Sequence, residues 1–180
     1  MAETAGVLLV ERSSTYHVLD ATSGNELQGI PNPSTDTFQS LIGVIAVGNI
    51  FLIYGGQTLE AIDASTQQII WKQEQFDAIK GLKISDDKKM IYVVQLNSVD
   101  QSLATPVQAL TALDLKTGTV RWTFQPPSSQ ASFVNPQSDG FQYSKGILFA
   151  TICMPDTQSS CARERLYAIN AATGNALWKF

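Results

Sequence analysis

The sequence predicts an all-β protein, a β-propeller made of four-stranded antiparallel blades. Segments of similar sequence recur along the chain at intervals of 43, 51 and 56 residues, close to the length of one propeller blade. All three tryptophans occupy the same slot in these segments, eight residues after an Asp or Asn. The four aligned segments are YHVLDATSGNELQGI (16–30), LEAIDASTQQIIWKQ (59–73), LTALDLKTGTVRWTF (110–124) and LYAINAATGNALWKF (166–180).

Each segment predicts a hairpin. An Asp or Asn at a strand end accepts hydrogen bonds from backbone N–H groups of the following turn. A Gly four residues later supplies a positive φ without steric cost, and the next strand carries the Trp. The turn residues are therefore expected to be structural; they are Asp20, Asp63, Asp114 and Asn170, followed by Gly24, Gly118 and Gly174.

Other β-branched and aromatic runs supply the remaining strands of each blade. The second strands are expected at 7–10, 50–54, 90–95 and 147–152, and the first strands at 41–47, 79–85 and 133–143. Only six residues precede the run at 7–10, so the first blade is expected to lack its first strand and to be incomplete. We therefore interpret 1–180 as a single propeller segment with blades at about 1–30, 31–75, 76–125 and 126–180.

The composition limits the classes of partner. Hydrophobic residues make up 44% of the chain and charged residues only 16%, which favours short strands around a core. The net charge of −4 argues against a nucleic-acid surface, which needs clustered Lys and Arg. No apolar run reaches the ~20 residues of a membrane-spanning helix, and no signal peptide is visible in the first thirteen residues.

Two long insertions point to one face of the propeller. Both fall between the second and third strands of a blade, at 98–108 and 155–165. In propellers such loops share a face with the blade-to-blade crossings, expected here at 28–39, 73–79 and 125–132. Binding is expected on this face because loops on a rigid scaffold commonly carry function. Neutral variation of loop length on a tolerant scaffold is the alternative.

The two cysteines, Cys153 and Cys161, have a C-x7-C spacing that matches no zinc motif, and the single histidine, His17, lies far away in the sequence. A disulfide between them would imply an oxidising compartment. It would contribute about 2–3 kcal/mol at most, because the loop it closes is short. Two unpaired thiols are the alternative.

The pattern Ala-x-Asp-x-x-Thr-Gly-x-x-x-Trp resembles the repeat of pyrroloquinoline-quinone-like (PQQ-like) β-propellers. Over the last three segments the matching residues are Ala61, Asp63 and Trp71, then Ala112, Asp114, Gly118 and Trp122, then Ala168, Asn170, Gly174 and Trp178. Gln67 replaces the Gly in the second segment, and Val18 and Gln28 replace the Ala and Trp in the first. The resemblance implies that each Trp packs between blades, against the repeat of a neighbour, where a small Ala lets the ring approach.

The PQQ-like family contains quinone-dependent dehydrogenases, a lipoprotein that assembles outer-membrane proteins, and many envelope proteins. The dehydrogenases use a calcium site of carboxylate and amide side chains, a catalytic Asp and often adjacent cysteines. This sequence has no adjacent cysteine pair, and turn chemistry accounts for its repeat Asp residues. We therefore expect no catalytic, cofactor-binding or metal-binding residues, and neither PQQ nor calcium.

Two functions remain open. The first is a non-catalytic binding or scaffold module of the periplasm, cell envelope or exterior, recognising a protein or glycan through the loop face. The second is a fragment of a PQQ- and calcium-dependent quinoprotein dehydrogenase. For assembly, the chain could close as a small ring, two chains could build an eight-bladed ring, or the chain could be part of a longer propeller.

Overall fold

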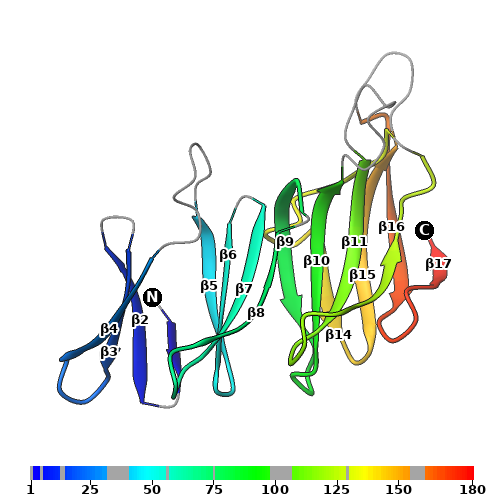
Figure 1. The fold of residues 1–180 in the computed structure, drawn as a ribbon. Helices are drawn as coiled ribbons and strands as arrows, with labels where there is room; N and C mark the ends of the chain where they lie inside the picture. Colours follow the sequence, from blue (N-terminus) through cyan, green and yellow to red (C-terminus); the bar gives the residue numbers. More distant parts are fainter. Residues whose placement is uncertain are drawn as a thin grey trace. The chain divides into compact units, whose positions relative to one another are not determined.

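The structure is a computed structural model that describes residues 2–4, 6–12, 15–31, 41–55, 57–74, 76–97, 107–128, 130–154 and 161–180. All regular elements in these ranges are β-strands, arranged in four antiparallel sheets (Figure 1). The all-β propeller-like architecture expected from the repeats is confirmed. The chain divides into two compact units, 1–76 and 77–180, and each is described by itself.

The first unit contains two four-stranded sheets in which neighbours in sequence are neighbours in space. One sheet has β1 (Ala2–Thr4), β2 (Val7–Arg12), β3 (Thr15–Asp20) and β4 (Glu26–Pro31); the other has β5 (Leu41–Val47), β6 (Ile50–Gly55), β7 (Thr58–Asp63) and β8 (Ile69–Gln73). The expectation that the first blade lacks its first strand was wrong. The three residues of β1 pair with Val7, Leu8 and Leu9 of β2, because a reversal at Gly6 with a φ of 76° brings them alongside.

The second unit also contains two sheets. The third blade has β9 (Ala78–Ile84), β10 (Met90–Asn97), β11 (Val107–Asp114) and β12 (Val120–Phe124). The fourth blade has β13 (Ser132–Phe133), β14 (Phe141–Ser144), β15 (Ile147–Met154), β16 (Arg163–Asn170) and β17 (Ala176–Lys179).

The single strand expected at 133–143 is instead two strands, β13 and β14, which both pair with β15. A turn around Asn135, whose φ is 42°, leads the chain away from the sheet. The Val134 N–H donates to the Thr151 carbonyl at 2.9 Å, and the Thr151 N–H donates to the Gly140 carbonyl at 2.8 Å. These two bonds hold the base of the excursion, so β15 stays paired on both sides of it.

The two sheets of each unit pack face to face, and the alternation along each strand decides which side chains meet. In the first unit, Val7, Leu9 and Val18 pack with a second-blade set that includes Phe51 and Ile62. In the second unit, one core joins the third blade to the fourth; its buried members are Tyr92, Val94, Leu110, Ala112, Ala131, Phe133, Phe141, Leu148, Ala150, Ile152, Tyr167, Ile169 and Ala171.

The third-to-fourth-strand turn of every blade has the chemistry expected from the motif. The Asp114 Oδ1 accepts from the backbone N–H of Lys116 at 3.0 Å and of Thr117 at 3.1 Å, and Asn170 does the same in the fourth blade. The glycines of the first, third and fourth turns have φ values of 71°, 68° and 76°. Gln67 occupies this slot in the second blade with a φ of 61°, so the backbone conformation is kept even where the glycine is missing.

Candidate binding surface

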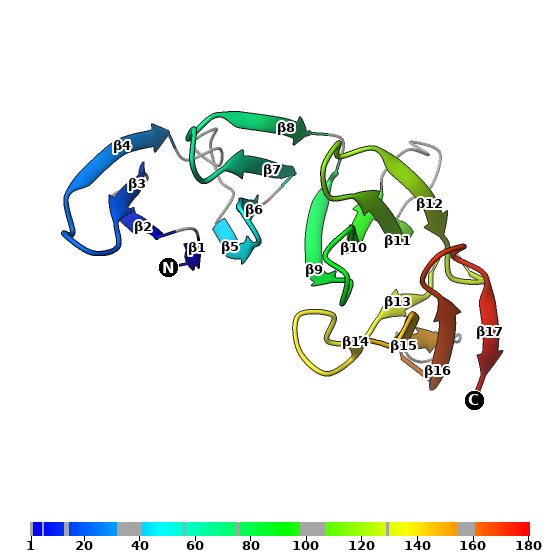
Figure 2. The same ribbon diagram turned by 90° about the horizontal axis from the view of Figure 1, so that it is seen from below.

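Trp122 joins the third blade to the fourth. Its indole Nε1 donates to the carbonyl of Ala171 at 3.1 Å, across the blade boundary. The ring covers Gly174, where an added Cβ would lie 2.6 Å from Trp122 Cε3. Figure 2 shows the β16–β17 turn beside β12. The inter-blade contact of this Trp is therefore made with the turn of the following repeat.

The alanine of the motif has a different place from the one expected. Ala112 lies opposite Trp122 of its own blade, and Ala61 and Ala168 lie opposite Trp71 and Trp178 in the same way. The small residues that the neighbouring ring approaches are Ala171 and Gly174 on the turn. The motif alanine instead leaves space for the Trp ring of its own blade to lie against the sheet. All three motif alanines are fully buried.

The three tryptophans differ in burial although they share one slot. Trp71 is 9% exposed, Trp122 is half-buried and Trp178 is 47% exposed. Phe149 lies beside Trp178, with ring centroids 6.1 Å apart. The side chain of Gln28, which takes the place of Trp in the first blade, lies outside the described residues.

The acidic residues of the turns are engaged in local hydrogen bonds. Backbone and side-chain donors of Ser23 lower the pKa of Asp20, and the backbone N–H of Thr66 lowers that of Asp63. A hydrogen bond from Arg121 at 2.7 Å is the largest cause of the lowered pKa of Asp114. These carboxylates stabilise their own turns as anions, which matches the structural role expected for them.

Because these pKa values are lower in the folded chain than in the unfolded chain, the carboxylates stabilise the fold above about pH 4 and lose this effect as the pH falls. We expect Asp20→Asn, Asp63→Asn and Asp114→Asn in combination to fold, because Asn170 already forms the same turn. The variant should lose less stability than the natural chain between about pH 5 and pH 2.5. Urea midpoints across this range measure the difference, and identical pH profiles would contradict the assignment.

One position of the third strand holds His17, Glu60, Thr111 and Tyr167 in the four blades, and each of these residues has its own partner. In the first blade, His17 Nδ1 lies 2.8 Å from Glu26 Oε1. In the third blade, Thr111 Oγ1 accepts a hydrogen bond from Gln95 Nε2 at 2.9 Å. Tyr167 packs on Phe124, with ring centroids 6.1 Å apart. The variety of side chains and partners supports a structural role for His17.

Glu60 takes this position in the second blade, where it is 3% exposed. Burial raises the pKa of its carboxyl, and Lys72 opposes that shift from 3.2 Å across the strand pair. Lys72 also contacts Glu74 at 2.5 Å. The buried carboxylate is thus held by a cross-strand cation, as a buried charge requires.

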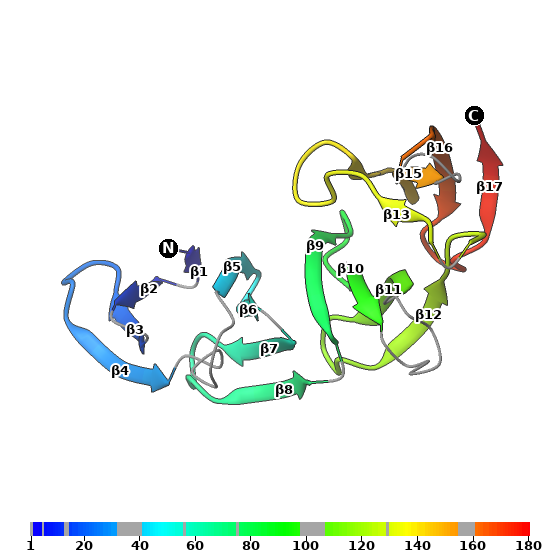
Figure 3. The ribbon, with the colours of Figure 1, turned by 90° about the horizontal axis from the view of Figure 1, so that it is seen from above.

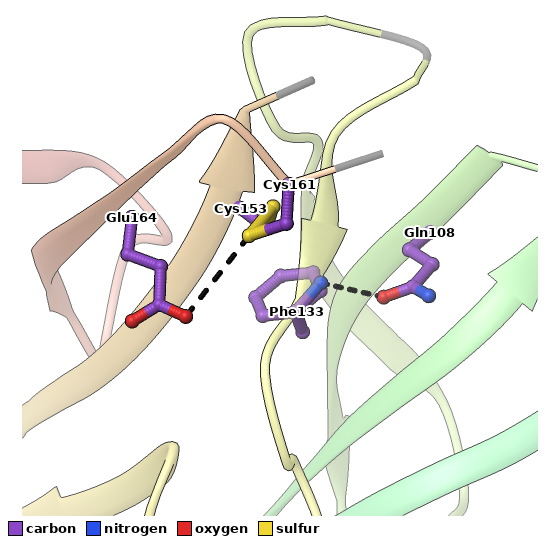
Figure 4. The surroundings of a disulfide bond; sticks show 5 residues. All are labelled: Gln108, Phe133, Cys153, Cys161 and Glu164. Atoms are coloured by element: carbon purple, nitrogen blue, oxygen red, sulfur yellow. Dashed lines mark hydrogen bonds between the residues drawn. A yellow bond between two sulfur atoms is a disulfide. The ribbon is translucent and has the colours of Figure 1, made fainter. Parts of the chain in front are cut away.

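Cys153 and Cys161 form a disulfide that ties the end of β15 to the start of β16 (Figure 4). Beside it, the Phe133 N–H donates to Gln108 Oε1 at 2.6 Å, which anchors β13 to the third blade.

In unit 2, the ends of the strands that the β10–β11 and β15–β16 connections join lie on one side, and the motif turns lie on the other (Figure 1). Of the two insertions, 98–106 and 155–160 lie outside the described residues, and so do 32–39, 75 and 129 of the three crossings.

An open apolar groove of about 410 Å³ lies where the third blade crosses to the fourth. Gln125 and Pro127 come from the crossing itself, so the groove includes part of the loop face predicted from the sequence. Lys179 is its one charged lining residue. The full lining is Phe124, Gln125, Pro127, Tyr167, Ala176, Leu177, Trp178 and Lys179. Sequence reasoning named the crossing but missed the groove, whose walls are distant in sequence.

Among the residues that the structure describes, no three His, Cys, Asp or Glu side chains gather closely enough to hold a metal ion. The repeat carboxylates serve their turns, and the two cysteines are bonded to each other across a hairpin. Over the same residues, no helix is long and apolar enough to cross a membrane.

A family model described as outer membrane protein assembly factor BamB matches residues 11–180. The chain belongs to this family of PQQ-like β-propeller repeats. The resemblance drawn from the Asp, Gly and Trp spacing is thereby confirmed. A comparison of this PQQ-like chain with curated proteins finds no match.

Solved structures share the fold at low sequence identity. A quinohemoprotein alcohol dehydrogenase from Pseudomonas putida HK5 matches with a TM-score of 0.64 and 18% identity, covering 100% of this chain and 34% of that one. A europium-containing methanol dehydrogenase matches with a TM-score of 0.64 and 13% identity, covering 97% and 39%. The β-propeller domain of Myceliophteria thermophila Cps50 matches with a TM-score of 0.58 and 14% identity, covering 92% and 54%. The PQQ-like chain therefore spans only 34% and 39% of the two dehydrogenases' length, and the likeness shows the fold alone.

Proposed function

We propose that this PQQ-like chain is a non-catalytic binding module of the cell envelope or exterior that recognises a segment of a partner protein. The observation that carries the proposal is the groove at the crossing from the third blade to the fourth. Its walls are the edge of β12, the crossing and the outer strand β17, so a rigid sheet on each side holds it open.

The chemistry of the groove favours a protein segment over a glycan. Phe124, Tyr167 and Leu177 present apolar surface, and Leu177 is 51% exposed. Aromatic and aliphatic walls with few polar groups suit a bulky apolar side chain, which gains by leaving water. Lys179, which also lines the groove, would pair with a carboxylate on the same segment. The lining side chains that can hydrogen-bond a glycan are those of Gln125, Tyr167, Trp178 and Lys179, and the other four lining side chains are wholly apolar.

The location part of the proposal rests on the disulfide and the family. Disulfides persist in oxidising compartments such as the periplasm and the extracellular space. The Cys153–Cys161 bond joins the two ends of the β15–β16 connection, at one of the two insertions predicted from the sequence. The family description, an outer membrane protein assembly factor, is consistent with an envelope location.

The groove is tested by selecting peptides from a displayed random library on the immobilised chain. We expect the selected peptides to combine an aromatic or aliphatic residue with an acidic one. Leu177→Ala should weaken their binding about tenfold or more, because a central apolar contact is lost. Lys179→Glu should weaken the binding of peptides that carry a carboxylate more strongly than the binding of the others.

Ile70→Ala is the matched control, because Ile70 holds the position of Leu177 in the second blade and is also exposed, at 42%. Peptides that respond equally to both alanine variants, or a library that yields no binder, would contradict the proposal. Binding to a glycan array that depends on Leu177 would replace the protein segment by a glycan.

The dehydrogenase alternative has its own test. If the chain were part of a quinoprotein site, PQQ with calcium would raise its melting temperature or shift the quinone absorption. We expect neither change, because the repeat carboxylates serve their own turns and the two cysteines are bonded to each other. A higher melting temperature in the presence of PQQ and calcium would favour the dehydrogenase fragment.

A further inference from the structure

The excursion at 134–140, between β13 and β14, contains the one Asp–Gly pair of the chain, Asp139 and Gly140. Figure 3 shows the excursion beside β9. Asp139 is exposed and Gly140 is half-buried. The Ser138 hydroxyl donates to Asp139 Oδ1 at 3.0 Å. An exposed carboxyl therefore comes directly before a residue that has no side chain to shield its backbone nitrogen.

The backbone N–H of Gly140 makes no hydrogen bond to any residue that the structure describes. The Thr151 N–H donates to the Gly140 carbonyl at 2.8 Å, and in a regular ladder the Gly140 N–H would donate back to the Thr151 carbonyl. That carbonyl instead accepts from the Val134 N–H at 2.9 Å. The nitrogen that follows Asp139 is therefore not engaged.

The motif turns show the opposite arrangement. In the first three blades, the residue after the motif Asp donates its N–H to a carbonyl of the turn between the first two strands. The three bonds are Ala21 to Gly6 at 2.8 Å, Ala64 to Asn49 at 2.9 Å and Leu115 to Lys89 at 2.8 Å. The carboxylates there also accept backbone N–H groups two and three residues on. Both groups that could react are thus engaged at these turns.

We infer that Asp139 is a modification site, at which the folded chain converts to isoaspartate without an enzyme. The Gly140 nitrogen bonds to Asp139 Cγ, and its proton leaves with the carboxyl hydroxyl as water, which forms a five-membered succinimide. Water then adds to one of the two ring carbonyls. If the nitrogen separates from Cγ, aspartate is restored; if it separates from the main-chain carbonyl carbon of Asp139, isoaspartate forms. This inference does not depend on the proposed binding of a partner at the groove.

Isoaspartate lengthens the main chain by one methylene group, and the excursion has no room for it. A Cβ built on Gly140 would collide with the Val134 carbonyl. The excursion also lies against the third blade, where a Cβ built on Gly81 of β9 would collide with the Pro136 carbonyl. Because these neighbours are backbone atoms, no side chain can move aside. The modification should therefore loosen the contact between the third and fourth blades.

Ageing the folded 180-residue chain at neutral pH and body temperature, followed by trypsin digestion, tests the site. Cleavage after Arg121 and Lys145 gives a peptide in which Asp139 is the one aspartate. Its asparagine, Asn135, precedes Pro136, which has no N–H to react. We expect a second form of this peptide, with equal mass and different retention, that accumulates and is labelled by an isoaspartyl methyltransferase. Electron-transfer fragmentation should place the extra backbone carbon at Asp139.

Asp139→Glu is the matched control, because a glutamyl side chain would have to close a six-membered ring, which forms far more slowly. The variant keeps the charge at an exposed position, so it should fold, and circular dichroism checks this. Its peptide should stay single. Ageing should leave its urea midpoint unchanged, whereas the midpoint of the natural chain should fall as isoaspartate accumulates.

A natural chain whose peptide stays single after ageing would overturn the inference, whether or not the chain unfolded in guanidinium chloride gives the second form. Equal conversion at Asp63 or Asp114 in the folded chain would also overturn it, because their following N–H groups are bonded. If isoaspartate forms and the urea midpoint stays the same, the excursion does not hold the two blades together.

Discussion

Replacing Trp122 by Ala is expected to lower the free energy of unfolding by about 3–5 kcal/mol, as for other large-to-small aromatic changes between packed sheets. The change removes a ring that covers Gly174 and contacts Tyr92, and it leaves the Ala171 carbonyl without its indole donor. Urea unfolding followed by circular dichroism measures the loss. The transition should shift to lower urea, with the fourth blade affected directly.

Trp178→Ala is the matched control for this prediction. The residue has the same slot and the same pairing with its motif alanine, but its ring is 47% exposed. We expect a loss of about 1 kcal/mol, typical of a substitution outside a closed core. Equal losses for the two variants, or an unchanged midpoint for Trp122→Ala, would show that the ring does not hold the blades together.

Gly174→Ala should have the second largest effect, about 2–4 kcal/mol. A Cβ at this position carries the cost of a left-handed backbone and also meets the Trp122 ring at 2.6 Å. Thermal and urea unfolding of the variant measure the combined cost. Because the indole cannot move without losing its bond to Ala171, little relaxation is expected.

Gly24→Ala separates the two contributions, because Gly24 has a φ of 71° and open space around its Cβ position. Only the backbone cost remains there, about 1–2 kcal/mol. The difference between the two alanine variants is then the cost of crowding the ring. If both variants lost the same stability, the Trp122–Gly174 contact would contribute nothing beyond the turn conformation.

The repeat made the blades and their turns predictable. Asp114, Gly118 and Trp122 act through bonds to the next few residues or through a strand position of period two, and such local rules can be read along the chain. The same local rules did not predict two features of the sheets. The short strand β1 and the division of 133–143 into β13 and β14 depend on pairing with β2 and β15, which no single segment specifies.

The candidate surfaces depend on pairs of residues that the repeat does not connect. Phe124 and Leu177 meet in one groove because the third blade stacks on the fourth at the spacing of packed sheets. Likewise, the motif places Trp122 and Trp178 at equivalent positions. Trp122 is half-buried because it packs on the turn of the fourth blade, whereas Trp178 is exposed.

The sequence alone therefore determined the class of fold, the turn chemistry and the slot of each tryptophan, because hydrogen bonds over a few residues and strand alternation set them. The folded chain decided which blade faces are covered, where the groove opens and that the motif alanine lies under its own tryptophan. Those features follow from contacts between sheets whose residues are as far apart as Trp122 and Ala171, and no local pattern encodes such a distance.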